Sequence, residues 1–403
     1  MFRSLILMGA MIGLMAAANP ALAQMTFDPR KDARMQAGPF YLTPTLTVDN
    51  VGVDSNVFND GTGPKPDFTA TVNPGAKVWL PIARRMLITT TPTVGFVYFK
   101  SYANQRSINP GVGVTGEVYL RRLTFSVSGS TGRSSARPNN EIDARARQAT
   151  HGGGGAVSLA LLSKLSVSVS ANQNVVKFDP GAVFAGASLA DTLNRTERVV
   201  GVSARRTITS LTTVVVSAES QRDRFEFSPI RNSDSVRAIA GFEFKPKALI
   251  SGDAKVGFRR FNVQDSRVPD FSGLVAASSV TYRATDGMQF ALDWNRDIQY
   301  SIQAQQPYYV SNDVAPSVRR QIAGKFDAIV MVDRDVNSYR SLAGSPEVRA
   351  RRDTTLRYSL DVGYRVNRVT RVGFAVSHLA RSSSDTSNDY RGLRAGLTMK
   401  YGF

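Results

Sequence analysis

Apolar and polar residues alternate along almost the whole chain, and this pattern restricts the possible fold more than any other feature. In residues 354–366, TTLRYSLDVGYRV, every second residue from Leu356 to Val366 is apolar or aromatic, and those between are polar or small. Successive strand side chains point to opposite faces, so this segment has one apolar and one polar face. The alternation recurs at 123–128, 165–170, 236–244 and 326–333. Such segments, separated by turn residues, predict an all-β fold: a transmembrane antiparallel up-and-down β-barrel.

The connections between these segments give the expected strand number. A barrel of the outer membrane alternates short periplasmic turns with longer outer loops. Short connections fall near 81–85, 121–122, 162–163, 206–210, 245–248, 286–287, 318–319 and 367–368, and longer polar stretches lie between them. With both termini in the periplasm, this pattern predicts about 18 strands. The segment 307–317 alternates poorly, so 16 is the alternative. A β-solenoid is the other architecture considered, but the sequence has no fixed repeat period.

The first residues resemble an export signal. Arg3 is followed by an apolar run and then by Ala21-Leu22-Ala23, the order of a signal peptide and its cleavage site. We therefore expect a signal peptide at 1–23, export to the periplasm, and one barrel domain at 24–403. The chain has no cysteine, so disulfides cannot stabilise it.

The chain ends in a strand that is apolar on one face, RAGLTMKYGF. This ending resembles the signal read by the barrel assembly machinery, which is therefore an expected partner. The matching residues are Arg394, Gly396, Met399, Tyr401 and Phe403. The last strand must also pair with the first, because an open sheet edge in lipid leaves backbone groups without hydrogen bonds.

Residues 40–60, FYLTPTLTVDNVGVDSNVFND, resemble the opening of the β-barrel porins of the second type, a family associated with exopolysaccharide clusters. The resemblance implies passage of polysaccharide across the cell outer membrane and polysaccharide export components as partners. The alternative interpretation of these residues is a strand end that continues into an Asn/Asp turn.

The formal net charge is +18, and part of it falls at the short turns. We expect these residues to contact phospholipid headgroups, the alternative being ordinary turn solubility. They include Arg84, Arg85, Arg121, Arg122, Arg205, Arg206, Arg319 and Arg320. Arg296 lies on an apolar face, where its guanidinium could reach a lipopolysaccharide phosphate. Nucleic acid is not an expected partner, because the chain is exported and has no basic stripe between aromatic residues.

The remaining charges alternate with apolar residues and are expected to line the lumen. They are Arg237, Lys255, Arg259, Arg283, Lys325, Arg357, Arg365, Arg394, Lys400, Asp293, Asp327 and Asp361. A net basic wall would favour anions over cations. Alternatively, some of these charges form neutral pairs across strands, and the positive bias of the wall is slight.

Catalysis, metals and cofactors are not expected. The two histidines, His151 and His378, have no paired serine or aspartate in an obvious position, and no Cys or His cluster has metal-ligand spacing. The favoured function is a passive channel for anionic solutes or polysaccharide. The alternative is a structural or surface-interaction barrel with a blocked lumen, whose loops bind polymer or partners. The loops show no obvious constricting insertion, which favours the open channel.

Overall fold

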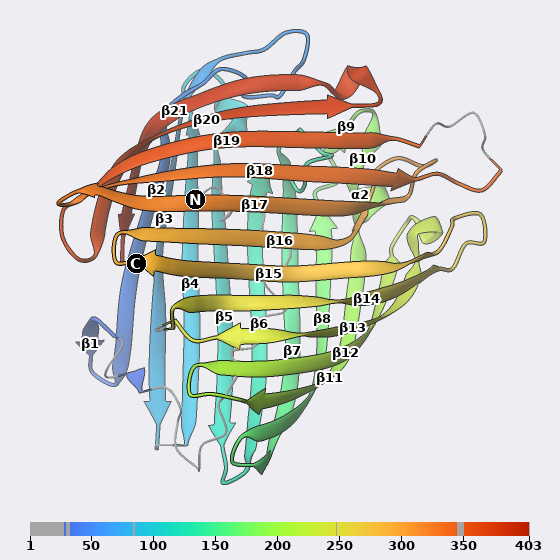
Figure 1. Cartoon of the computed structure of the whole chain (residues 1–403). Helices are drawn as coiled ribbons and strands as arrows, with labels where there is room; N and C mark the ends of the chain where they lie inside the picture. The colour runs from blue at the N-terminus through green and yellow to red at the C-terminus, as the bar shows by residue number, and fades with distance from the viewer. Residues whose placement is uncertain (1–27, 30–32, 84, 247, 345–349, 403) are drawn as a thin grey trace.

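The computed structural model describes residues 28–29, 33–83, 85–246, 248–344 and 350–402. The expected signal peptide, Arg84 and Phe403 lie outside the described residues. Eighteen antiparallel strands form a closed barrel, in which β2 (Phe40–Asp54) pairs with both β3 and the last strand, β21 (Tyr390–Tyr401) (Figure 1). The barrel and the strand number agree with the sequence prediction.

The other strands of the barrel follow one another around the wall in chain order. They are β3 (Asp67–Ile82), β4 (Met86–Phe99), β5 (Ser107–Tyr119), β6 (Leu123–Ala136), β7 (Ala146–Leu162), β8 (Leu165–Phe178), β11 (Arg195–Thr207), β12 (Thr212–Phe225), β13 (Ser233–Phe244), β14 (Ile250–Val263), β15 (Phe271–Thr285), β16 (Met288–Tyr300), β17 (Tyr308–Ala323), β18 (Phe326–Arg340), β19 (Arg352–Arg365) and β20 (Thr370–Ser383). The short strand β1 (Met35–Ala37) pairs with the start of β2.

Short turns and longer loops alternate around the barrel as the sequence predicts. The longest described loop, between β8 and β11, contains the hairpin β9 (Val183–Phe184) and β10 (Ala187–Ser188) and the helix α2 (Leu189–Leu193). Shorter loops contain the single turns η2 (Ala103–Gln105), η3 (Pro229–Arg231) and η4 (Thr386–Asn388). One predicted turn is wrong: residues 318–319 lie inside β17, which continues to Ala323. Following the short-turn rule, we assign the turns to the periplasmic side and the loops to the outer side.

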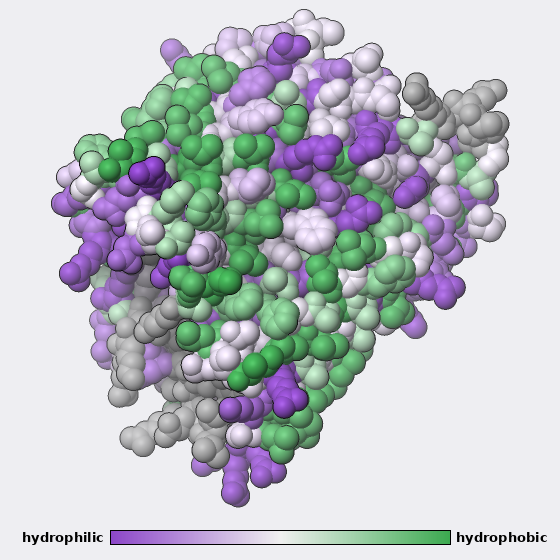
Figure 2. Space-filling view, in the orientation of Figure 1, coloured by the Kyte–Doolittle hydropathy of each residue, from purple (hydrophilic) through white to green (hydrophobic). Residues whose placement is uncertain are grey.

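The outward face carries the apolar half of the alternation. Several side chains that face away from the lumen are half to two-thirds exposed, as at Val127, Val200, Phe258, Val330 and Leu397. Hydrophobic side chains form a broad band across the face shown in Figure 2, and hydrophilic ones are more frequent towards its ends. Among the described residues, no helix is long and apolar enough to cross a membrane.

Two apolar clusters fill part of the outer end of the barrel interior. The first, here called the mouth cluster, contains Ile142, Leu189, Leu193, Phe225 and Ile302, which come from four different loops or strand ends. The second contains Phe261, Phe271 and Tyr308. Loop residues therefore pack inside the barrel mouth, and this packing positions the candidate site.

Candidate channel site

The loop 137–145, between β6 and β7, crosses the mouth of the barrel. Its Asn140 Nδ2 donates to Asp335 Oδ2 on β18 over 2.6 Å. In the closed order of eighteen strands, β18 lies on the opposite side of the barrel from β6 and β7. The same loop also contacts the loop 55–66, where Arg137 Nη2 donates to the carbonyl oxygen of Val57 over 2.7 Å. We call residues 137–145 the crossing loop.

Glu141 fixes the centre of the crossing loop to the end of the β16–β17 hairpin. Its carboxylate accepts a hydrogen bond from Ser301 Oγ at 2.7 Å and another from the Ile302 backbone N–H at 3.2 Å. The side chain is 1% exposed. Burial raises the pKa of Glu141 to about 7, because the charged form loses its hydration there. A carboxyl group that titrates near neutral pH therefore holds the loop in place.

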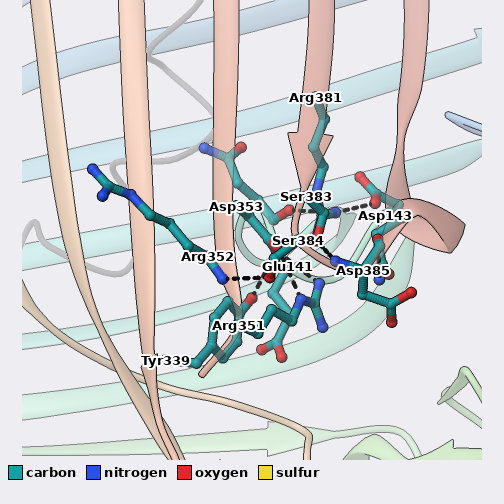
Figure 3. A network of polar contacts seen from close by, with 12 residues as sticks. Glu141, Asp143, Tyr339, Arg351, Arg352, Asp353, Arg381, Ser383, Ser384 and Asp385 are labelled. Atoms are coloured by element: carbon teal, nitrogen blue, oxygen red, sulfur yellow. Dashed lines mark hydrogen bonds and ion pairs between the residues drawn. The ribbon is translucent and has the colours of Figure 1, made fainter. Parts of the chain in front are cut away.

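Arg381 on β20 connects the crossing loop to the wall through a dense polar network (Figure 3). Its Nη1 lies 2.6 Å from Asp143 Oδ2 and 3.0 Å from the carbonyl oxygen of Asn140. Its Nη2 donates to Asp353, which also accepts from Arg351 at 2.7 Å. The Arg381 side chain is fully buried. Removing one partner of such a buried charge pair is costly, because the other charge stays buried and unpaired.

Two further segments close in on the crossing loop. The ladder between β15 and β16 stops at Ala276 and Arg296, although β16 continues beside β17 to Tyr300, whose hydroxyl donates to Asp223 on β12. Tyr300 at this end packs edge-to-face on Phe225, with ring centroids 4.7 Å apart. In the loop 226–232, Arg231 Nε donates to the carbonyl oxygen of Ser301 over 2.8 Å.

The expectation that the loops contain no constricting segment is wrong. The crossing loop is short, but its residues reach the opposite wall because strand ends and neighbouring loops lean in to meet it. Its contacts join residues more than 150 positions apart, such as Glu141 and Ser301. Loop length alone could not reveal them. The one local signal in the sequence is the apolar Ile142 beside Glu141 in an otherwise polar loop, which the sequence analysis did not use.

Most of the predicted lumen cations do face inward, but they are paired with carboxylates. The pairs are Arg237 with Glu219 and Asp297, Lys255 with Glu243, Arg259 with Asp297, Arg357 with Asp333, Arg365 with Asp327 and Arg394 with Asp54. Arg283, Lys400, Asp293 and Asp361 lie on the inward face of their strands by register. The wall as a whole is thus largely compensated rather than strongly basic. Lys325 is a correction, because it lies in the turn before β18, where Nζ donates to the carbonyl oxygen of Val366.

One part of the wall, near the periplasmic end, does keep an excess of cations. Asp327 is buried among Arg319, Arg365 and Arg371, with nitrogen–oxygen distances of 2.7, 3.3 and 2.7 Å. Arg371 also lies 2.6 Å from Asp361 Oδ1. Lys400 is the direct cross-strand partner of Arg371. We call these four cations and two carboxylates the basic patch.

The predicted headgroup residues divide between the rim and the lumen. Arg85, Arg121 and Arg122 are exposed in short turns, and Arg206 and Arg320 are exposed on the outward face near strand ends. Two are corrections. Arg205 faces the lumen, where its Nη2 lies 3.7 Å from Glu243. Arg319 belongs to the basic patch, because the turn comes six residues later than the sequence suggested.

The residues of the proposed assembly signal lie on the strand that closes the barrel. Met399 and Tyr401 pair with Val48 and Leu46 of β2. Arg394 and Gly396 occupy the inward positions, opposite Asp54 and Gly52. Phe403 lies outside the described residues. The role of these residues in assembly remains a prediction.

Neither histidine faces the lumen. His151 lies opposite Thr131 on the outward face, and its ring nitrogen is 2.9 Å from the Thr131 hydroxyl. His378 pairs with the outward-facing Tyr358 and Leu393. Among the described residues there is also no group of His, Cys, Asp and Glu side chains that could hold a metal ion.

We compared the chain with known protein families and structures. The profile of the family described as "Putative beta-barrel porin 2" matches residues 28–403. No curated protein matches the sequence. The fold is similar to the BenF-like porin from Pseudomonas fluorescens Pf-5, at 10% identity and a TM-score of 0.51, covering 90% of this chain and 99% of that one. OccAB3 from Acinetobacter baumannii has 10% identity and a TM-score of 0.49, covering 90% and 99%. The protein opdK from Pseudomonas aeruginosa has 11% identity and a TM-score of 0.48, covering 89% and 98%. The family match extends over nearly the whole barrel, so the chain belongs to this porin family and is a porin-like β-barrel of the outer membrane.

Proposed function

We propose that the protein is a gated channel for small hydrophilic solutes and that the structure represents its closed form. The crossing loop carries the proposal, because it bonds to the opposite wall through Asn140, Glu141 and Asp143. Solutes pass when this loop leaves the mouth. The function is passive and non-enzymatic, in keeping with the porin family. Export by a signal peptide at 1–23 is part of the same proposal.

The basic patch supports a preference for anions. It holds Arg319, Arg365, Arg371 and Lys400 against Asp327 and Asp361, and Asp49 is a third carboxylate close enough to act on the charge of Lys400, so the cations still exceed the carboxylates by one. The side chains of Arg319 and Arg365 are 28% and 43% exposed, so they face the lumen water. A cationic wall segment between low-dielectric walls raises the local concentration of anions.

Small anions fit this interior better than a polysaccharide does. Sugar rings commonly stack on exposed aromatic faces, and most of the inward aromatic residues are at least nine-tenths buried, although Tyr300 and Tyr41 are only partly buried. The buried ones are Trp79, Phe99, Tyr119, Phe178, Phe225, Phe261, Phe271, Tyr309 and Tyr339. Passage of an anionic polysaccharide, which the family resemblance implies, stays the second candidate.

The experiment is ion selectivity in planar bilayers with a tenfold KCl gradient. The protein should carry an intermittent current whose reversal potential shows that chloride is more permeant than potassium. Replacing Arg365 and Lys400 by Gln should shift the potential towards cations, and the matched control, Arg121→Gln with Arg122→Gln, should leave it unchanged. The absence of current under all conditions would favour the blocked surface barrel. A cation-selective wild type would reject the anion preference.

A further inference from the structure

The wall of the barrel has a seam between β5 and β6 at its outer end. The ladder between these strands stops at Gly111 and Gly132. Both strands continue beyond this point, because β5 still pairs with β4 as far as Ser107 and β6 with β7 as far as Ala136. Pro110, just above the last pair, has no backbone N–H to donate. The two strands therefore separate at the level of the outer leaflet.

Side chains bridge the seam instead of backbone hydrogen bonds. The Ser135 backbone N–H donates to Asn109 Oδ1 over 2.9 Å. From the lumen side, Arg145 Nη2 donates to the Ser107 hydroxyl and to the carbonyl oxygen of Ser135. The guanidinium of Arg145 lies over the Phe99 ring at 5.3 Å. The seam is thus filled from inside and hollow on its outer surface.

A groove of about 770 Å³ lies over the seam on the outward surface. Its apolar side is formed by Phe96, Tyr98 and Ile108, which are 45%, 43% and 66% exposed. Its polar side carries Arg106, Arg133 and Arg147, with Asp179 as the acidic residue of the lining. Below it, Gly129 and Gly153 face outward, and a Cβ at either position would meet no atom closer than 3.8 Å. The outward pair Thr131 and His151 separates these glycines from the groove and forms its lower edge.

The three arginines of the groove differ in how many contacts they already make within the protein. Arg106 is already fixed: its Nε donates to the Phe99 carbonyl oxygen over 2.8 Å, and its guanidinium lies 4.6 Å from the Tyr98 ring centroid. Arg133 and Arg147 are exposed, and neither makes an ion pair within the described part of the chain. They lie on adjacent strands, since Arg133 pairs with Ala149 and Arg147 with Ser135. Two guanidinium groups side by side suit the oxygens of a phosphate.

We propose that this groove binds a phosphorylated glycolipid of the outer leaflet, the lipid A part of lipopolysaccharide. Its phosphate would lie between Arg133 and Arg147, and an acyl chain would lie along Phe96, Tyr98 and Ile108. Three cations against one carboxylate favour an anionic headgroup, and the exposed apolar side favours a lipid over a soluble anion. The groove lies at the outer end of the barrel wall, so the lipid that can reach it is that of the outer leaflet. The site is independent of the proposed channel function.

The test is binding of bisphosphorylated hexa-acyl lipid A to the purified barrel in detergent, measured by native mass spectrometry and by titration. We expect one tightly bound lipid, with affinity reduced at least tenfold in Arg133→Gln with Arg147→Gln. Ala149→Trp, which fills the groove without removing charge, should reduce binding similarly. The control Arg121→Gln with Arg122→Gln removes the same charge at the periplasmic rim and should bind normally.

Three outcomes would overturn the proposal. The first is unchanged affinity in the groove variants while heat modifiability shows a folded barrel. The second is equal loss in the rim control, which would mean unspecific charge attraction. The third is equal binding of dephosphorylated lipid A, which would remove the role of the arginines.

Discussion

Opening of the channel should depend on pH through Glu141. The pKa of this carboxyl is about 7 in the docked loop, against an ordinary value of 4.5. Below pH 4.5 Glu141 is protonated in both states, so docking has its full strength. Between pH 4.5 and 7 only the released loop is ionised, and docking weakens as pH rises. Each unit is worth about 1.4 kcal/mol, so the full shift amounts to roughly 3.4 kcal/mol, or about three-hundredfold in the opening equilibrium.

Burial also raises the pKa of Asp143 in the same loop, so its titration changes the opening equilibrium in the same direction as that of Glu141. Arg351 and Arg231 stabilise the charge of Glu141 and Asp353 opposes it. The assay is open probability of single channels at pH 5 to 8, with both chambers at the same pH. Wild-type opening should increase with pH, and Glu141→Gln, which cannot ionise, should show a much weaker dependence on pH. A Glu141→Gln channel with the wild-type profile, or opening that decreases with pH, would refute this reasoning.

Three further predictions follow from the geometry. Arg381→Met removes the ion-pair partner of Asp143, which keeps its hydrogen bond from Asn59, so the loss of docking free energy should be at or below the roughly 3–5 kcal/mol of a broken buried pair. Single-channel recording should show a largely open channel, and unchanged gating would contradict the role of the network. Leu397→Arg places a charge on the lipid face of the closing strand and should lower the unfolding free energy by about 2–4 kcal/mol; urea titration in lipid vesicles measures it, and no change would mean that the residue does not face lipid. Cysteine at Ser266 should react with an impermeant maleimide on intact cells, while cysteine at Ser163 should not; the reverse pattern would invert the topology.

The barrel could be predicted from the sequence because alternate residues of each strand face lipid and lumen, and their polarity follows these two environments. In β19, Tyr358, Leu360 and Val362 face outward and are 50%, 45% and 41% exposed, as their spacing of two requires. The same local rule predicted nine outer loops and eight short turns. It failed at 318–319, because Arg319 and Arg320 resemble the basic turns elsewhere although β17 continues past them.

The candidate site could be predicted only in part, because the fold brings together residues that are far apart in the sequence. The inward direction of Arg357 follows from alternation, but its partner Asp333 follows from strand register. Asn140 and Asp335 are 195 positions apart, and nothing local to either residue indicates their contact. The seam could not be predicted for the same reason. Pro110 can be seen in the sequence, but β5 and β6 separate there only because each continues to pair with its other neighbour, β4 or β7.

The most direct test of the central claim is a reversible lock on the crossing loop. Asn140 Nδ2 and Asp335 Oδ2 are 2.6 Å apart across the mouth, and the native chain has no cysteine, so Asn140→Cys with Asp335→Cys introduces a single thiol pair. Its disulfide would be confirmed by mass spectrometry, and current would be recorded in planar bilayers before and after reduction. If the crossing loop is the gate, the oxidised protein carries no current and reduction restores it. Equal currents in the oxidised and reduced protein would show that solutes do not need the loop to move.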